Sequence, residues 1–322
     1  MDKQSKNYKR HIQSSIEQMT YYRFSTFTTA YYFPEIEDPD TTFLYGLYSP
    51  YGGKLSRWYW YHFKRSHFVR SLTSVRDEKL PFLYRLIREL VGDEAMLSFN
   101  MGSPGTEQKI SMLGYVPETK KKFFAKFAQK PDAMRLSRHE IEVLRLLKDT
   151  KLVPQLFDSK IANDYVYLQT ECVQGTRPGD TLLNDEVVNL LITLSAFHYP
   201  DPATYPADLC TCLSHGDFCP WNMLVQTDNS LRMIDWEMAG ERILGYDLFT
   251  WLLNVAGLVI GKIPLYHIIE KNRKSIMRYF NALQINDYTP YLRIFIEQQM
   301  VNLRKRNKLH LLERYQELYS QL

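Results

Sequence analysis

Residues 213–237 read LSHGDFCPWNMLVQTDNSLRMIDWE, and the fold of the chain can be predicted from this stretch. It contains two apolar runs, at 222–226 and 231–236, which have the composition of short strands. The four residues between them, Thr-Asp-Asn-Ser at 227–230, are typical of a tight hairpin turn. The sequence therefore predicts a β-hairpin here, and a hairpin brings its two outer ends to one place.

Polar side chains mark both ends of this predicted hairpin. Asp217 precedes the first strand, Asn222 opens it, and Asp235 closes the second strand. Two carboxylates and one amide oxygen would therefore gather around one point. Hard oxygen ligands of this kind suit Mg²⁺ with phosphate groups attached. The alternative is a polar hairpin in which these side chains only satisfy the backbone of a turn.

The hairpin resembles the active site of the protein-kinase-like small-molecule phosphotransferases, the aminoglycoside phosphotransferase and choline kinase family. The family pattern is His-Gly-Asp, four residues, Asn, and a hydrophobic strand that ends in Ile-Asp-Trp or Ile-Asp-Phe. This chain has His-Gly-Asp at 215–217, Asn222 and Ile-Asp-Trp at 234–236. The resemblance implies that Asp217 is the catalytic base for the attacking hydroxyl, and that Asn222 and Asp235 hold magnesium.

The same resemblance implies an α/β (α+β) fold of the two-lobed protein-kinase-like type. It would have a small β-rich N-lobe, a mainly helical C-lobe and, in this chain, an N-terminal extension. We expect residues 1–92 to form this aromatic-rich extension, whose role the sequence does not indicate. Residues 93–173 would form the nucleotide-binding N-lobe, and residues 174–322 the C-lobe with the catalytic loop and the acceptor site.

A glycine-containing loop opens the predicted N-lobe. Residues 95–100 and 109–115 read as strands, and the turn between them, 101–107, contains Gly102 and Gly105. Backbone N–H groups in such a turn can cover nucleotide phosphates. An ordinary hairpin turn would have the same composition.

A lysine lies inside the next predicted strand. Lys126 stands between apolar residues of 122–128, and a buried ammonium group is costly unless it has a partner. The family places its phosphate-contacting lysine in such a strand and its glutamate partner on the following helix, here 135–147. Glu140 matches the family position best, with Glu142 as the alternative one helical register away. A solvent-facing Lys–Glu pair is the other interpretation.

Four further residues take roles by resemblance alone. Glu171 and Val173 lie in the segment that resembles the connector between the lobes, where backbone groups receive the adenine. His215 would support the catalytic loop without reacting. Asp247 would brace the same loop or cap the helix that begins near Leu248.

The N-terminal region has weaker signals. Strands are predicted within 21–33, which is dense in Tyr, Phe and Thr, and as a hairpin at 42–48 and 57–63. Apolar residues at helical spacing predict a helix over 79–91. The C-terminal half reads as helical, with two or three amphipathic helices in 263–322.

Composition limits the possible partners. The net charge of +4 on 322 residues is too mild to favour nucleic acid, and no apolar run is long enough for a confident membrane span. The first residues do not resemble a secretory signal, so the four cysteines are expected to be reduced thiols in the cytoplasm. Zinc at Cys210, Cys212, His215 and Cys219 is the weaker alternative, because Cys-x-Cys is not a usual zinc spacing.

The predicted reaction is transfer of the γ-phosphoryl group of ATP, or GTP, with Mg²⁺, to a hydroxyl of a small molecule. An aminoglycoside, a choline-like amino-alcohol or a sugar would all serve as the acceptor. One alternative is a nucleotide-binding pseudokinase that acts as a scaffold. A protein kinase is less favoured, because Ile-Asp-Trp replaces Asp-Phe-Gly and no Ala-Pro-Glu segment follows. The sequence does not indicate an oligomeric state.

Overall fold

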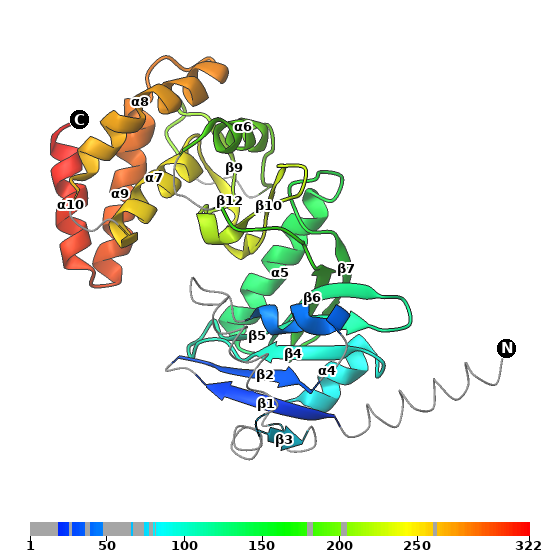
Figure 1. The fold of residues 1–322 in the computed structure, drawn as a ribbon. Helices are drawn as coiled ribbons and strands as arrows, with labels where there is room; N and C mark the ends of the chain where they lie inside the picture. The colour runs from blue at the N-terminus through cyan, green and yellow to red at the C-terminus, as the bar shows by residue number, and fades with distance from the viewer. Residues whose placement is uncertain are drawn as a thin grey trace, which may run out of the picture. The chain divides into compact units, whose positions relative to one another are not determined.

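The computed structural model divides into two compact units. Unit 1 comprises residues 1–145 and 155–172, and unit 2 comprises residues 146–154 and 173–322. The residues that the structure describes are 19–25, 28–35, 39–47, 66, 74–76, 80, 82–178, 183–200, 205–259 and 263–322. Unit 1 is rich in strands and unit 2 is mainly helical, so the predicted fold class is confirmed (Figure 1). The predicted domain boundaries after residues 92 and 173 stay predictions.

Unit 1 is built on an antiparallel sheet of eight strands among its described residues. The strand order is β3-β1-β2-β4-β5-β6-β8-β7. The strands are β1 (Thr20–Ser25), β2 (Ala30–Pro34), β3 (Ser74–Arg76), β4 (Met96–Asn100), β5 (Lys109–Val116), β6 (Lys121–Ala128), β7 (Leu156–Ile161) and β8 (Val166–Glu171). The strands predicted within 21–33 and from 95 to 128 are confirmed.

Three strands of the aromatic-rich region belong to this sheet. β1 pairs with β2 and β3, and β2 pairs with β4 through Tyr31 opposite Asn100 and Tyr32 opposite Phe99. The side chain of Tyr21 is buried against the rings of Tyr84 and Phe99, at centroid distances of 5.9 and 5.7 Å. The aromatic residues of this region therefore form core for the sheet that carries the glycine loop.

The hairpin predicted from 42–48 and 57–63 is wrong in its first strand. Pro39–Leu47 forms the 3₁₀-helix η1, while 57–63 lies outside the described residues. Leu44 is fully buried against Tyr115, and Tyr45 packs on Phe33 with its hydroxyl donating to the Pro34 carbonyl at 3.1 Å. A short apolar run is compatible with either a strand or a buried helical turn. Here the segment packs on the sheet as a helical turn.

Two helices complete unit 1. The predicted helix at 79–91 is α4 (Tyr84–Val91), and the helix predicted at 135–147 is α5 (Pro131–Leu146). α5 begins at a proline, whose fixed φ suits the first turn, and Asp132 follows where the helix dipole favours an acid. Its buried face contains Ala133, Met134, Leu136, Ser137, Glu140, Ile141, Val143 and Leu144.

Unit 2 holds two two-stranded antiparallel sheets and five α-helices among its described residues. β9 (Thr211–Ser214) pairs with β12 (Gly240–Ile243), and β10 (Met223–Val225) pairs with β11 (Leu231–Met233). The single-turn 3₁₀-helices η3 (Pro220–Asn222) and η4 (Trp236–Met238) follow β9 and β11 respectively. The helices are α6 (Asp185–Leu194), α7 (Tyr246–Val259), α8 (Leu265–Ala282), α9 (Thr289–Lys305) and α10 (Leu309–Ser320).

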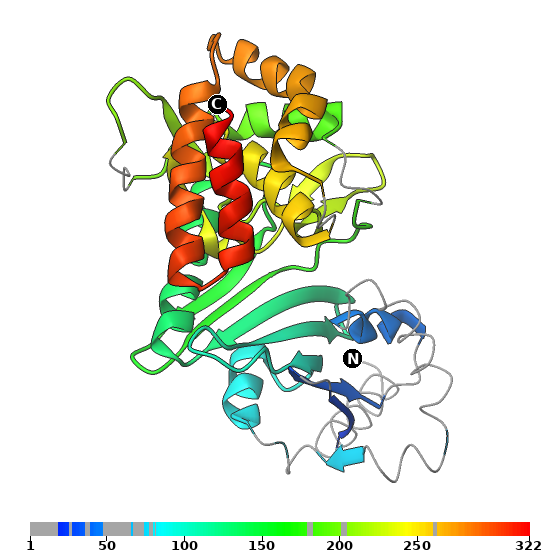
Figure 2. The same cartoon turned by 90° about the vertical axis from the view of Figure 1, so that its left-hand side faces the viewer.

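The C-terminal helices confirm the amphipathic pattern of 263–322. α9 and α10 lie side by side in both views (Figures 1 and 2). α9 begins after a break in which Asp287 Oδ1 accepts the Thr289 N–H at 2.9 Å and Pro290 occupies the first turn. In the described part of the chain, no helix is long and apolar enough to cross a membrane.

Candidate active site

A short loop after β9 carries the His-Gly-Asp motif. Gly216 has a φ of +83°, and a Cβ added to it would lie 2.0 Å from the carbonyl oxygen of Met238. A side chain at this position would therefore clash with backbone as well as adopt an unfavourable conformation. The motif needs its glycine so that the loop can pass close to the end of η4.

Asp247 holds the backbone of this loop. Its Oδ2 accepts the N–H of His215 at 2.6 Å, and its Oδ1 accepts the N–H of Gly216 at 3.0 Å. The carboxyl group is buried, and desolvation raises its pKa, while His215 and the two N–H donors oppose that rise. Asp247 lies in the first turn of α7, so the helix is tied to the motif through both carboxylate oxygens.

His215 links the two halves of the motif. Its Nε2 donates to the Ile234 carbonyl at 3.0 Å, and its ring lies 4.7 Å from the Trp236 ring. Since the carbonyl oxygen can only accept a hydrogen bond, Nε2 is the donor. The buried Nδ1 has no hydrogen-bond partner among the described residues. His215 therefore connects the His-Gly-Asp loop to the segment that contains Ile234 and Trp236.

Asn222 donates both of its amide hydrogens to Asp217. Its Nδ2 lies 3.0 Å from the Asp217 carbonyl oxygen and 2.9 Å from Asp217 Oδ2. The Cys219 thiol approaches the other carboxylate oxygen, Oδ1, at 3.6 Å. The Asp217 carboxylate is thus held from two sides, and the remaining polar atom of the Asn222 side chain is an acceptor, Oδ1.

The prediction that Asp235 closes the second strand is wrong. β11 ends at Met233, and Asp235 adopts the left-handed conformation, with φ 69° and ψ 58°, before η4. The Ile234 N–H donates to the Asn222 carbonyl at 2.9 Å, so the two ends of the hairpin meet as expected. A left-handed Asp costs about 1 kcal/mol, and such strained residues are common at functional sites.

The zinc alternative does not fit this geometry. Cys212 is buried, Cys210 is exposed, and all four cysteines are free thiols. In the described part of the chain, these cysteines and His215 are not close enough together to share a metal ion. Burial raises the pKa of the Cys219 thiol, and the neighbouring Asp217 carboxylate adds to that rise.

Lys126 and Glu140 form a buried ion pair in unit 1. The Lys126 ammonium on β6 lies 2.9 Å from Glu140 Oε1 and 2.6 Å from Oε2 on α5. Only 6% of Lys126 and 4% of Glu140 is exposed. The glutamate that pairs with Lys126 is therefore Glu140, and Glu142 lies on the exposed side of α5.

The glycine loop joins β4 to β5. Gly102 has a φ of +69°, and a Cβ there would lie 2.4 Å from the Lys109 carbonyl oxygen. Its N–H donates to Asn100 Oδ1 at 2.9 Å, and Lys130 Nζ donates to the Gly105 carbonyl at 2.7 Å. The loop is thus anchored at both glycines.

The segment predicted to connect the lobes follows β8. Glu171 is the last residue of β8, and its Oε2 accepts the Gln155 N–H at 3.3 Å. Val173 is the first residue of unit 2 after β8.

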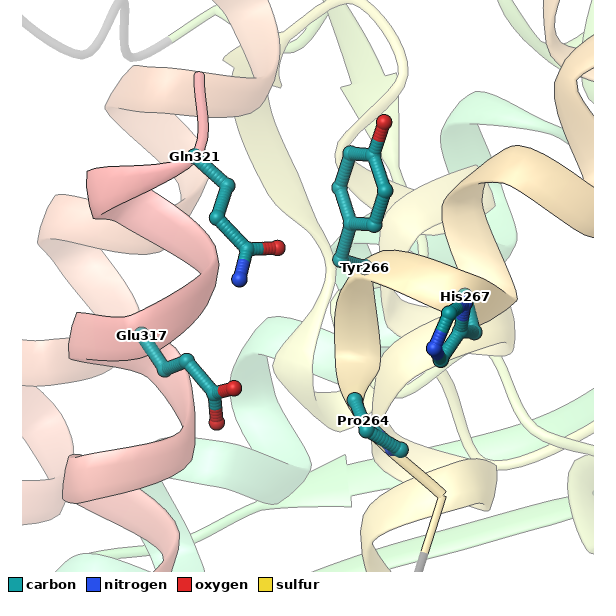
Figure 3. Close-up of a pocket in the computed structure, with 5 residues that line it drawn as sticks. All are labelled: Pro264, Tyr266, His267, Glu317 and Gln321. Atoms are coloured by element: carbon teal, nitrogen blue, oxygen red, sulfur yellow. The ribbon is translucent and has the colours of Figure 1, made fainter.

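Described residues of unit 2 line at least two cavities. One, of about 420 Å³, lies between the start of α8 and the end of α10 and is lined by Pro264, Tyr266, His267, Glu317 and Gln321 (Figure 3). The other, of about 340 Å³, is lined by Arg242, Tyr246, Glu297, Gln298, Val301 and Asn302. Sequence reasoning did not identify Arg242, because no motif marks it.

Residues 201–261 match the phosphotransferase enzyme family. This segment contains the His-Gly-Asp motif, Asn222, Asp235 and Asp247. The resemblance to the family is therefore confirmed, and it supports the predicted phosphotransferase class. No curated protein matched the chain by sequence.

One solved structure, a choline kinase, supports the kinase-like fold, and two aminoglycoside phosphotransferase structures give lower scores. Choline kinase LicA from Streptococcus pneumoniae is 16% identical, with a TM-score of 0.51, covering 72% of this chain and 96% of that one. An aminoglycoside-3'-phosphotransferase of type VIII is 17% identical, with a TM-score of 0.49, covering 72% and 97%. An aminoglycoside phosphotransferase from Streptomyces rimosus, solved with ADP and streptomycin, is 15% identical, with a TM-score of 0.42, covering 71% and 96%.

Proposed function

We propose that the chain transfers the γ-phosphoryl group of ATP or GTP to a hydroxyl group of a small molecule. The observation that carries the proposal is the pairing of Asn222 with Asp217. It uses both amide hydrogens of Asn222 to orient the Asp217 carboxylate, and it leaves Oδ1 as an oxygen ligand. A side chain that only satisfied the backbone of a turn would not need to donate to the Asp217 carboxylate while leaving its own oxygen open to a ligand.

Asp217 acts as the base in this proposal. Its carboxylate accepts a hydrogen bond from the acceptor hydroxyl and takes the proton as the oxygen attacks the γ-phosphorus. Asn222 keeps the carboxylate in one orientation, and Asp247 keeps the backbone of the loop in place. His215 supports the loop from behind and takes no part in the proton transfer.

Asn222 Oδ1 and the Asp235 carboxylate would hold Mg²⁺. Both are hard oxygen donors, and they stand at adjoining ends of one hairpin, so the donor set suits this ion. When bound, Mg²⁺ would offset the negative charge of the phosphate oxygens.

Unit 1 would supply the contacts to the nucleotide. The Lys126 ammonium, fixed by Glu140, grips the phosphates, and N–H groups of the loop with Gly102 and Gly105 cover them. Backbone groups near Glu171 and Val173 would receive the adenine. Positioning and electrostatic stabilisation would then supply most of the rate acceleration.

The test is ADP release from Mg²⁺-ATP by the purified chain, with and without a panel of small alcohols. The panel contains choline, aminoglycosides, sugars and neutral polyols. We expect acceptor-dependent release that falls by about 10²- to 10⁴-fold in Asp217→Asn, because the base is lost while the shape is kept. Release that is unchanged in Asp217→Asn would refute the role of this residue. Binding of ATP with no release for any acceptor would favour the scaffold alternative.

A further inference from the structure

The cavity of about 340 Å³ lies beside the proposed catalytic loop. Arg242, one of its lining residues, stands on β12 opposite Cys212 of β9, the strand that leads into the His-Gly-Asp motif. Its Nη2 donates to the Met238 carbonyl at 3.0 Å, and a Cβ added to Gly216 would lie 3.1 Å from the same Nη2. The guanidinium therefore lies against the residue that precedes Asp217.

Arg242 brings a positive charge to this cavity, and that charge also lowers the pKa of the nearby buried carboxyl of Asp247. In the part of the chain that the structure describes, no carboxylate lies within ion-pair distance of it, and its buried Nε has no hydrogen-bond partner. The guanidinium is stacked 4.5 Å from the centre of the Tyr246 ring, which fixes its plane. An oriented guanidinium with unused donors is suited to a carboxylate or a phosphate group.

The opposite wall of the cavity is a polar face of α9. It is formed by Glu297, Gln298, Val301 and Asn302. Hydrogen bonds hold this helix in place, because Gln299 Nε2 donates to the Tyr246 hydroxyl at 3.3 Å and Gln298 Nε2 donates to the Tyr205 hydroxyl at 3.1 Å. Glu297 Oε1 accepts the Tyr319 hydroxyl at 2.7 Å, so this carboxylate is partly engaged within the protein.

Size and polarity restrict the ligand. Ligand pockets span roughly 300 to 1,000 Å³, and this cavity, at about 340 Å³, is at the small end of that range. Among the described residues that line it, Tyr246 is the one aromatic residue, and the Arg242 guanidinium already lies over that ring. These residues therefore do not form an aromatic cage of the kind that selects quaternary ammonium groups.

We propose that this cavity binds the phosphoryl acceptor and that Arg242 selects an acceptor carrying an anionic group, a small hydroxylated carboxylate or phosphate ester. This inference rests on the proposed function, since it names the substrate class of the same site. Arg242 binds the anionic end, Gln298 and Asn302 offer hydrogen bonds to further hydroxyls, and the reacting hydroxyl extends past Gly216 to Asp217.

The experiment compares matched probes that differ in charge. Binding of D-glycerate, glycerol 3-phosphate, glycerol and choline is measured by calorimetry with Asp217→Asn protein and Mg²⁺-ADP, and ADP release is measured with the wild type. We expect at least one anionic probe to bind more tightly than glycerol and choline. In Arg242→Gln that affinity, and kcat/KM where turnover occurs, should fall by about tenfold to a hundredfold, the effect of losing a charged hydrogen bond. Preference for glycerate or for the phosphate ester then separates the two anion classes.

Arg278→Gln is the matched control. Arg278 is an arginine of the same unit, on α8, bound at the surface to Asp185 and Asn189 at 2.6 Å each, and its loss should leave every probe unaffected. Equal losses for neutral, cationic and anionic probes in Arg242→Gln would overturn the proposal, because Arg242 would then serve only the structure of the loop. Failure of both anionic probes to bind at millimolar concentration would also overturn it. A neutral alcohol turned over with a higher kcat/KM than either anionic probe would do the same while the proposed function stood. Absence of Mg²⁺-ATP turnover with every acceptor would instead count against the proposed function itself.

Discussion

Removing one member of the buried pair Lys126–Glu140 should destabilise unit 1 strongly. Both carboxylate oxygens of Glu140 lie within 2.9 Å of the ammonium, and neither residue is more than 6% exposed. In Lys126→Met the Glu140 carboxylate would stay buried without its cation, which costs about 3–5 kcal/mol in comparable pairs. In Lys126→Met/Glu140→Leu neither charge of this pair remains, so most of this loss should be recovered.

The assay is urea unfolding of the wild type, the two single variants and the double variant, arranged as a double-mutant cycle. Since the chain has two units, unfolding should be followed by hydrogen exchange of α5 and β6 amides as well as by circular dichroism. Arg278→Gln is the control for an exposed pair, because Arg278 is 40% and Asp185 81% exposed, and surface pairs contribute about 0–1 kcal/mol. If Lys126→Met cost less than about 1 kcal/mol, or if the single losses simply added in the double variant, the argument from burial would be refuted.

Two further predictions concern unit 2. Gly216→Ala should lower the free energy of unfolding by about 2 kcal/mol or more and should also lower the rate of phosphoryl transfer. The reason is that the added Cβ would lie 2.0 Å from the Met238 carbonyl oxygen, at a φ of +83°. Thermal unfolding and ADP release measure the two effects, and a variant of wild-type stability would contradict the prediction. The pKa of Glu241 is lowered although its burial acts to raise it, because it accepts hydrogen bonds from Thr211 Oγ1 (2.6 Å), the Tyr199 N–H (2.8 Å) and His198 Nδ1 (2.9 Å). A carboxyl whose pKa is lower in the folded state adds stability above its unfolded pKa and loses it as the pH falls through the folded pKa. Wild type should therefore exceed Glu241→Gln in stability most at neutral pH and progressively less below the usual glutamate pKa of about 4.3, and a difference that does not change with pH would contradict this assignment.

The sequence by itself determined the features that depend on short spacing. His-Gly-Asp at 215–217, Asn222 and Asp235 predicted a hairpin with its polar ends together, and the Ile234–Asn222 backbone bond places them so. Strands and helices with clear periodicity, such as β6 and α5, were also predictable. Local chain geometry fixes these relations, because a turn of a few residues leaves few arrangements.

Only the tertiary structure decided the relations between distant residues. The choice of Glu140 over Glu142 depends on which face of α5 is buried against the sheet, and that face is a property of packing. Asp247 reaches the backbone of His215 across 32 positions of sequence, and no spacing rule predicts such a bond. The helical form of Pro39–Leu47 depends on burial of Leu44 and Tyr45 against the sheet. Arg242 carries no motif, and its place beside Gly216 follows from the pairing of β9 with β12, which depends on how the folded chain brings distant segments together.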